Sequence, residues 1–466
     1  MQLRLRELAT AELPCRTRLP FRFGAVTVTS APLLHLRCVV EAKDGRTAIG
    51  MASDLLVPKW FRKDLDRPPE ADQVALRTSV REAGQRYAAH GFLPAFLHWQ
   101  QVQNELIEAQ PALAPGLLEA GFGVALVERA MLDGACRLAN QSFWSALQSD
   151  LFRRQLLHGA QAWANPVAML PARPLEHIAV RHTVGRLDPL RAAEVPAAER
   201  LDDGMPQALD EVLARHGVRW LKVKIGGGHD QDVARLTAIG QLLLELQRED
   251  VAVTLDGNEQ IESVPALRSL WRATEATAPG RSLLQRVKWV EQPLPRNRDE
   301  RDPASDPSAW TFCPLVLDEG DVQKDTLARS SYHGVSVKNC KGVFRALGNR
   351  ELAAAPGSVR FQTSEDLTNL PILALQQDLC TAACLDLGNS ERNGHHYFPG
   401  LAHLPAPVVE AALAAHGDLY ERTATGARLR IEAGALTIRS LHGPGYGCDA
   451  TVLASLDRTL DWQPLA

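Results

Sequence analysis

The sequence predicts an α/β protein built around a (β/α)8-type barrel, with an α+β domain ahead of it. From about residue 176, short β-branched runs alternate with segments of helical periodicity, and most of the runs end in a polar or charged residue. Strands that alternate with helices form βαβ units and a parallel sheet, and eight such units at spacings of about 20 to 35 residues predict a closed barrel.

The residues before the barrel have a different pattern. PFRFGAVTVTSAPLLHLRCVVEAKDGRTAIGMAS predicts an antiparallel hairpin with DGRT at or near its turn. ALRTSVREAGQRYAAHGF and FGVALVERAMLDGACRLA then have helical periodicity. We therefore expect residues 1–165 to form an α+β domain.

The eight predicted barrel strands are HIAVRHTVG, VRWLKVKIG, VAVTLDGN, VKWVEQPL, PLVLDEG, GVSVKNC, SVRFQTS and AACLDLGN. Between them, segments such as DVARLTAIGQLLLELQ carry an apolar helical stripe. We place the barrel at residues 166–400. Residues 401–466 do not continue its rhythm, so we expect this tail to return to the N-terminal domain and complete it.

Composition gives no reason to expect a nucleic-acid or membrane partner. The 466 residues are 45% hydrophobic and 23% charged, with a formal net charge of -4. No apolar run is long enough to span a bilayer, and the first residues lack the apolar core of a signal peptide. The eight cysteines are scattered, as free thiols would be. These features predict a cytoplasmic protein.

Three consecutive predicted strands end in acidic residues. Asp256 closes the third run, Glu291 the fourth, and Asp318 with Glu319 the fifth. A single acid at a strand end is usually a turn residue, but neighbouring strands lie about 5 Å apart, so these carboxylates would converge. Converging carboxylates repel unless a cation lies among them, and oxygen ligands suit a hard dication such as Mg2+, or Mn2+ in its place.

Lysines flank these acids on both sides. Lys222 and Lys224 share one face of the second strand, and Lys338 ends the sixth. The second and sixth strands lie on roughly opposite sides of an eight-stranded ring, so Lys224 and Lys338 would face each other across the metal site. A substrate carboxylate at the metal would then present its α-carbon to two amines, and the metal would stabilise the enediolate formed when the α-proton leaves.

These motifs resemble those of the enolase superfamily, specifically its muconate lactonizing enzyme-like subgroup (the mandelate racemase/muconate lactonizing enzyme family). The resemblance rests on KVK at residues 222 to 224, LDGN, VEQPL, LDEGD and VKNCKG, in the family's order. It extends to the family's N-terminal capping domain, with LPFRFG in place of the flexible specificity loop, and to VERAMLDGACRL, which is similar to the helix leading into the barrel. It therefore covers nearly the whole chain.

The resemblance implies a role for each of the strand-end acids. Asp256, Glu291 and Asp318 would ligate Mg2+, and Glu319 would support them from behind. Asn258 would steady Asp256 or a metal-bound water, although an Asn that only forms the turn fits the sequence equally well.

The resemblance also implies that Lys224 and Lys338 are the acid/base pair and that Lys222 is an electrostatic helper. A lysine base combined with Mg2+ is the known chemistry of this superfamily. The resemblance further implies a homo-oligomer, and a small-molecule carboxylate as the substrate.

Residues that contact the substrate are predicted in the cap loop and at the last two strand ends. These are Phe21, Phe23, Glu365 and Asp386. Dipeptide epimerases carry Asp-x-Asp at the eighth strand, whereas Asp386 is followed by Leu-Gly, which argues against a dipeptide substrate. The mandelate racemase subgroup would need a histidine after the seventh strand, and QTSEDLTNLP has none. In the polar stretch NSERNGHHYFPG, substrate contacts and an ordinary surface loop are equally consistent with the sequence.

The sequence thus favours Mg2+-dependent abstraction of a proton α to a carboxylate. Racemisation, epimerisation, cycloisomerisation and β-elimination all stay open, and so does the substrate, a small carboxylic acid or an N-acyl amino acid. Two alternatives are a Schiff-base aldolase, which needs only one strand-end lysine but leaves the three acids unexplained, and a non-catalytic barrel that binds a carboxylate.

Overall fold

Eight parallel strands close into a barrel, which confirms the predicted fold class. The computed structural model describes residues 1–466 apart from 24–25, 110–115, 159–164, 299–301 and 466. Consecutive barrel strands are neighbours, and the ring closes where β11 pairs in parallel with β4. The strands are β4 (His177–Val184), β5 (Trp220–Lys224), β6 (Ala252–Asp256), β7 (Val287–Glu291), β8 (Leu315–Leu317), β9 (Gly334–Val337), β10 (Phe361–Ser364) and β11 (Asn389–Arg392).

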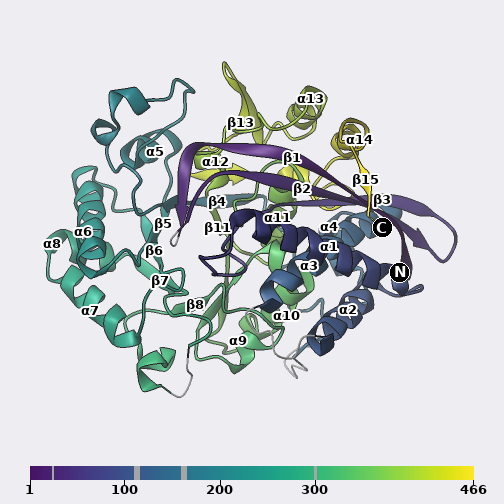
Figure 1. The fold of residues 1–466 in the computed structure, drawn as a ribbon, viewed down its shortest axis with the longest axis horizontal. Helices are drawn as coiled ribbons and strands as arrows, with labels where there is room; N and C mark the ends of the chain where they lie inside the picture. The colour runs from purple at the N-terminus through teal and green to yellow at the C-terminus, as the bar shows by residue number, and fades with distance from the viewer. Residues whose placement is uncertain (24–25, 110–115, 159–164, 299–301, 466) are drawn as a thin grey trace.

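Helices follow the barrel strands and cover the outside of the barrel (Figure 1). The stripe predicted for α6 is buried at Leu236, Ile239 and Leu243, which attaches that helix to the sheet. Within the described residues, no helix is both long enough and apolar enough to cross a membrane. The helices are α5 (Leu209–His216), α6 (His229–Glu245), α7 (Val264–Glu275), α8 (Ala278–Leu284), α9 (Thr326–Arg329), α10 (Val343–Ala353), α11 (Leu373–Cys384) and α12 (Gly394–Tyr397).

The N-terminal domain is an antiparallel sheet covered by helices. Its predicted turn lies at Gly45, which has a positive φ of 85°. The sheet lies very close to α3, because a Cβ on Gly50 would stand 2.0 Å from the carbonyl oxygen of Ala130. The elements are β1 (Leu3–Phe23), β2 (Val26–Ala42), β3 (Thr47–Leu55), α1 (Pro69–Ala89), α2 (Ala95–Ala109), α3 (Leu117–Leu138) and α4 (Phe143–Gln148).

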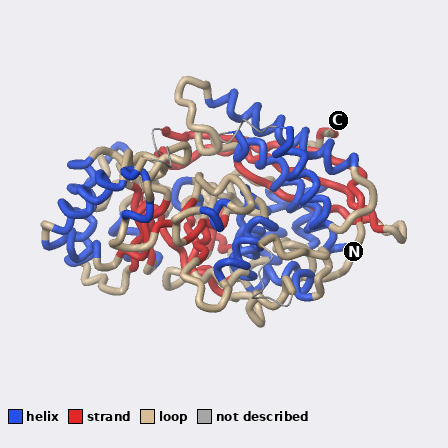
Figure 2. The backbone as a smooth tube through the Cα atoms, turned by 90° about the horizontal axis from the view of Figure 1, so that it is seen from below, coloured by secondary structure: helices blue, strands red, loops and turns tan. Residues whose placement is uncertain are grey.

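Strands β1 and β2 form a long hairpin that crosses from the N-terminal domain to the barrel (Figure 1). In Figure 2 the barrel strands and these long strands form two separate red groups. Arg18 of β1 donates to the carbonyl of His396 in α12 at 2.7 Å, and Phe21 packs on Tyr397 with ring centroids 4.4 Å apart. The hairpin therefore covers one side of the barrel mouth.

The C-terminal tail contacts both parts of the molecule. The last strand, β15 (Gln463–Pro464), pairs with β1 and so completes the N-terminal sheet as predicted. Unexpectedly, β14 (Ala435–Thr437) pairs antiparallel with barrel strand β4. The boundaries at 165 and 400 stay predictions. The other elements of the tail are α13 (Ala406–Ala415), β12 (Tyr420–Thr423), β13 (Gly426–Leu429) and α14 (Ala450–Thr459).

The prediction for the eighth strand is wrong in position. AACLDLGN was expected to be the strand, but its first residues end α11, and the strand begins only at Asn389. Leu385 and Leu387 are buried in the helix C-terminal turn, where the amide of Leu387 donates to the carbonyl of Ala382 at 3.0 Å. Buried and exposed residues alternate in this turn as they do in a strand, which explains the wrong prediction. Asp386, exposed and with φ of 60°, therefore precedes the strand and lies at the opposite end from the predicted site.

Stability is expected to fall below pH 6.5 because His35 is buried in the sheet core. Burial, together with His403, lowers the pKa of His35 to about 3, against roughly 6.5 in the unfolded chain. As the pH falls, His35 is therefore protonated in the unfolded chain before it is protonated in the folded protein. The stability present above pH 6.5 is lost as the pH falls towards 3. Between pH 6.5 and 5 this loss is about 2 kcal/mol for one such group.

Urea unfolding at pH 7, 6 and 5 measures this dependence. His35→Leu should reduce the loss, whereas His177→Leu, at an exposed position at the start of β4, should leave it unchanged. The same pH dependence in wild type and His35→Leu would show that another group titrates.

Candidate active site at the carboxyl ends of the barrel strands

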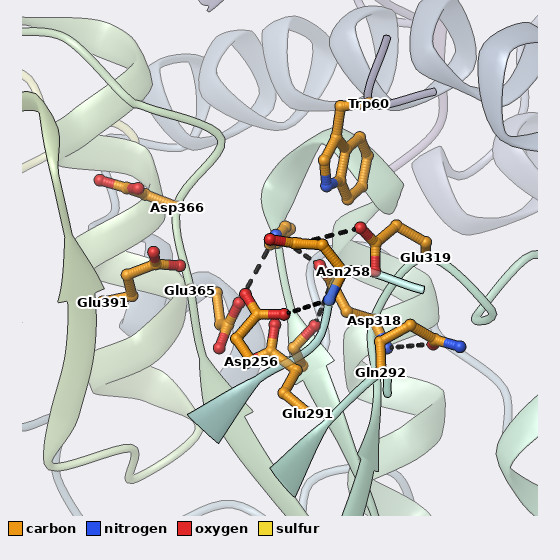
Figure 3. A network of polar contacts seen from close by, with 12 residues as sticks. Trp60, Asp256, Asn258, Glu291, Gln292, Asp318, Glu319, Glu365, Asp366 and Glu391 are labelled. Atoms are coloured by element: carbon orange, nitrogen blue, oxygen red, sulfur yellow. Dashed lines mark hydrogen bonds and ion pairs between the residues drawn. The ribbon is translucent and has the colours of Figure 1, made fainter. Parts of the chain in front are cut away.

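The predicted lysines and acids converge at the carboxyl ends of the barrel strands. Strand register sets Lys224 beside Asp256 and Asp256 beside Glu291. Asp318 follows β8 and Lys338 follows β9, so both lie on the same end of the ring. All five side chains are buried. Figure 3 shows the carboxylates pointing towards one another across the barrel mouth.

Lys222 lies at the centre of a ring of four carboxylates. Its Nζ is 2.6 Å from Glu365, and 2.9 Å from each of Asp256, Glu291 and Glu391. The lysine is completely buried. Burial alone would lower the pKa of Lys222, but the four carboxylates outweigh it and raise that pKa well above its ordinary value. Lys222 therefore holds a fixed positive charge among the acids, as an electrostatic helper would.

Lys224 and Lys338 approach the carboxylates from opposite sides. Three strands separate β5 from β9 in either direction around the ring. Lys224 donates to Asp256 Oδ2 at 2.5 Å and to Asn258 Oδ1 at 2.9 Å. Lys338 donates to Asp318 Oδ2 at 2.7 Å. The two amines thus face the same group of acids from different directions.

One group of carboxylates lies close enough to hold a metal ion. Ligand oxygens of Glu291, Asp318 and Glu365 lie within 4.8 Å of one another. This trio differs from the predicted set, because Glu365 replaces Asp256. Both oxygens of Asp256 already have partners. The amines of Lys222 and Lys224 contact Oδ2, and the backbone amide of Asn258 donates to Oδ1 at 2.9 Å.

The carboxylates show the electrostatic strain that a cation would relieve. Glu291 Oε2 and Glu319 Oε2 are buried without a hydrogen-bond partner among the described residues. Burial, with Glu365 and Asp256 nearby, raises the pKa of Glu291 well above its ordinary value despite Lys222. Buried carboxylate oxygens lacking a donor are suited to a hard dication such as Mg2+. The donor set therefore fits the metal that the sequence predicts.

Glu319 and Asn258 contact each other behind these ligands. Asn258 Nδ2 donates to Glu319 Oε1 at 3.1 Å, and the same oxygen lies 3.3 Å from Lys63 Nζ. Asn258 has a positive φ of 42°, and its Oδ1 accepts from Lys224 of β5 at 2.9 Å. The residue therefore does more than form a turn.

Several residues of the site were not found from the sequence. Gln292 Oε1 accepts from the amides of Asp318 and Gly320, both at 2.9 Å, and so fixes the turn after β8. Lys341 is buried, with Nζ 3.3 Å from Asp318 Oδ1. In the sequence, Gln292 stands in VEQPL and Lys341 is the second lysine of VKNCK. These motifs draw attention to the two residues but do not show which atoms their side chains contact.

A pocket opens above this cluster between the two domains. The N-terminal domain contributes apolar residues to it, and the Trp60 ring lies over the amine of Lys338 at 4.6 Å. The lining residues are Phe21, Val57, Trp60, Lys224, Asn258, Lys338, Asp366, Leu367, Thr368, Glu391 and Asn393. Burial raises the pKa of Asp366 to about 7. A bound molecule would therefore contact both lysines and the aromatic rings of Phe21 and Trp60.

The predicted substrate contacts have different outcomes. Phe21 lines the pocket, whereas the side chain of Phe23 lies outside the described residues. Glu365 is buried below, where Arg181 donates to its Oε1 at 3.0 Å. Glu391, rather than Asp386, supplies the acid of the eighth strand, and the neighbouring lysines outweigh burial to lower the pKa of Glu391.

The two histidines of the stretch after β11 pack against His182 of β4. His395 Nε2 lies 3.3 Å from His182 Nδ1, and the His396 and His182 ring centroids are 5.0 Å apart. Neither His395 nor His396 lines the pocket that holds the lysines.

Comparison with solved structures identifies the fold. No protein-family model matches the sequence, and comparison with curated proteins found no match. A mandelate racemase/muconate lactonizing protein from Herpetosiphon aurantiacus is 15% identical, with a TM-score of 0.58 over 95% of this chain and 98% of that one. A Bradyrhizobium enolase complexed with magnesium and mandelic acid is 15% identical, with a TM-score of 0.57 over 99% of both chains.

A dipeptide epimerase from Enterococcus faecalis, complexed with Mg and the dipeptide L-Leu-L-Tyr, is 13% identical, with a TM-score of 0.59 over 95% of this chain and 99% of that one. Since identities are this low, the matches establish architecture and leave the reaction open. The chain therefore has the enolase-superfamily fold, in the form found in mandelate racemase/muconate lactonizing enzyme structures.

Proposed function

We propose that this protein is a Mg2+-dependent enzyme that removes the proton α to a substrate carboxylate. The observation that carries the proposal is the placement of Lys224 and Lys338, which contact Asp256 and Asp318 from strands on opposite sides of the ring. An α-carbon held between these amines has one base available on each face.

The acids would hold the metal, and the lysines would move the proton. Asp256, Glu291 and Asp318 are the proposed ligands, and Glu365 lies close enough to join them or to replace Asp256. Mg2+, when bound, would stabilise the negative charge that develops on the substrate carboxylate. Mn2+ would serve the same purpose.

In this reaction one lysine takes the proton from the α-carbon, and the other returns a proton from the opposite face or supplies positive charge. Lys222 keeps the acids neutralised, and Trp60 excludes water above Lys338. Racemisation or epimerisation uses both lysines chemically, whereas cycloisomerisation or elimination uses one. The geometry supports all of these reactions.

The proposed substrate is a small carboxylic acid or an N-acyl amino acid. Two proteins of the same fold were crystallised with carboxylates, namely mandelic acid and a dipeptide. We keep a homo-oligomeric assembly and a cytoplasmic location as predictions. The two alternatives, a Schiff-base aldolase and a non-catalytic barrel that binds carboxylates, are tested by borohydride trapping with a carbonyl substrate and by the exchange experiment below.

The protein is expected to exchange the α-proton of its substrate for deuterium in D2O with Mg2+. Mass spectrometry of N-acyl amino acids, dipeptides, muconates and hydroxy acids detects this exchange even when the overall reaction is unknown. EDTA should abolish the uptake and added Mg2+ should restore it, because without the dication the developing charge is unstabilised.

Glu291→Gln is the matched variant for this measurement, because it removes one ligand charge with little change of shape. It should weaken Mg2+ binding in calorimetry and reduce exchange together. Uptake that persists in EDTA would contradict the metal-dependent reaction, and no Mg2+ binding at all would favour the non-catalytic barrel.

A further inference from the structure

Lys63 reaches from the N-terminal domain into the polar groups behind the proposed metal site. Its Nζ lies 2.7 Å from Glu259 Oε2 and 3.3 Å from Glu319 Oε1, and it also donates to the carbonyl of Asn258. Glu319 is completely buried, whereas 27% of the Lys63 side chain is exposed. A surface lysine of one domain thus ends beside a buried acid of the other.

A continuous series of contacts leads from Lys63 to Lys224. Lys63 contacts Glu319 Oε1, which accepts from Asn258 Nδ2 at 3.1 Å. Because its Nδ2 is directed to Glu319, Asn258 turns Oδ1 towards Lys224, whose Nζ donates to it at 2.9 Å. Reversing the amide would place a donor against the lysine and an oxygen against the carboxylate.

We propose that Lys63 is a positioning residue, which fixes the Asn258 amide through Glu319 and so places the amine of Lys224. This inference rests on the proposed function, in which Lys224 is a catalytic base or acid. A residue of the N-terminal domain then helps to position a catalytic lysine of the barrel. Lys224 reaches its full position only when the N-terminal domain is docked on the barrel.

Other contacts attach this segment to the barrel without Lys63. Arg296 donates to the carbonyls of Trp60 and Phe61, both at 3.2 Å. It also binds both oxygens of Glu259, at 2.8 and 2.9 Å. Loss of the Lys63 amine should therefore leave Trp60 over the pocket, which separates positioning from docking of the segment.

Lys338 provides an internal control. Its contacts are to Asp318 at 2.7 Å, to Glu365 at 3.5 Å and to the Trp60 ring, none of which belongs to the series from Lys63. The two lysines are similarly buried, at 7% and 5% exposure. If a substitution of Lys63 changes the reactivity of Lys224 but not that of Lys338, its effect passes through the proposed series of contacts.

The test compares lysine acetylation by N-hydroxysuccinimidyl acetate in wild type, Lys63→Met, Lys63→Arg and Lys43→Met, with Mg2+ present. Lys43 is an exposed lysine of the β2–β3 turn. Peptide mass spectrometry measures the labelling rate at each lysine. In Lys63→Met, Lys224 should label about fivefold faster, the change expected for one hydrogen bond. Lys338 should keep its rate, and Lys63→Arg should return Lys224 towards the wild-type value.

The same proteins are assayed for α-proton exchange with the fastest carboxylate of the panel, where Lys63→Met should lower kcat and leave KM nearly unchanged. Equal changes at both lysines, or none at Lys224, would overturn the inference. If the wild type exchanges no proton, the proposed function fails, but the labelling rates still decide whether Lys63 positions Lys224.

Discussion

Lys222→Met is expected to destabilise the folded protein by about 3 to 5 kcal/mol, the usual cost of removing one partner from a buried ion pair. Methionine fills nearly the same volume, so the loss is electrostatic. Lys222 is the only described cation within 3 Å of all four of Asp256, Glu291, Glu365 and Glu391. Without it these buried carboxyl groups have no neighbouring positive charge in common.

Urea unfolding of wild type and Lys222→Met measures this cost, with Lys288→Met as the matched control. Lys288 lies on β7, the strand that carries Glu291, but its side chain is exposed. Its loss should change the free energy of unfolding by less than about 0.5 kcal/mol.

Mg2+ should return part of the stability that Lys222→Met loses, because a dication among the acids replaces the missing charge. A variant as stable as wild type in EDTA would contradict the placement of Lys222 among the four carboxyl groups. A loss that Mg2+ cannot reduce would instead argue that the metal lies elsewhere.

Most of the fold was predictable because most of the barrel strands are short β-branched runs that end in a polar or charged residue. Lys224, Asp256 and Glu291 are the last residues of their strands, so their order in the sequence is also their order around the ring. The eighth strand was misplaced because a buried helix C-terminal turn has the same apolar alternation as a short strand.

The contacts between domains were not predictable. Lys63 and Asn258 are 195 positions apart, and Lys63 and Glu319 are 256 apart, so no local pattern joins them. Glu365 was predicted at the site, but its role depends on Lys222 and Arg181, which belong to two other strands. Periodicity indicates which face a side chain occupies, whereas its partner across the barrel depends on strand tilt and register.

Lys224→Ala and Lys338→Ala are each expected to lower α-proton exchange by about 100- to 10,000-fold for the substrate face that they serve. The reason is that each amine approaches the site from its own side, and neither can reach the other's position. Lys288→Ala, which removes an exposed lysine, is the matched control. Circular dichroism and Mg2+ calorimetry should show that the variants fold and still bind the metal.

The pattern of losses between the two enantiomers of the substrate identifies the reaction type, which the positions of the lysines alone leave open. In a racemase or epimerase, Lys224→Ala should stop exchange from one enantiomer and Lys338→Ala from the other, because each lysine removes the proton on its own face. In a cycloisomerase or an eliminating enzyme, one variant should lose exchange completely. The other should keep it at a reduced rate, because its lysine contributes only positive charge. Full exchange from both enantiomers in both variants would show that neither amine is the base, and the assignment of the acid/base pair would then be wrong.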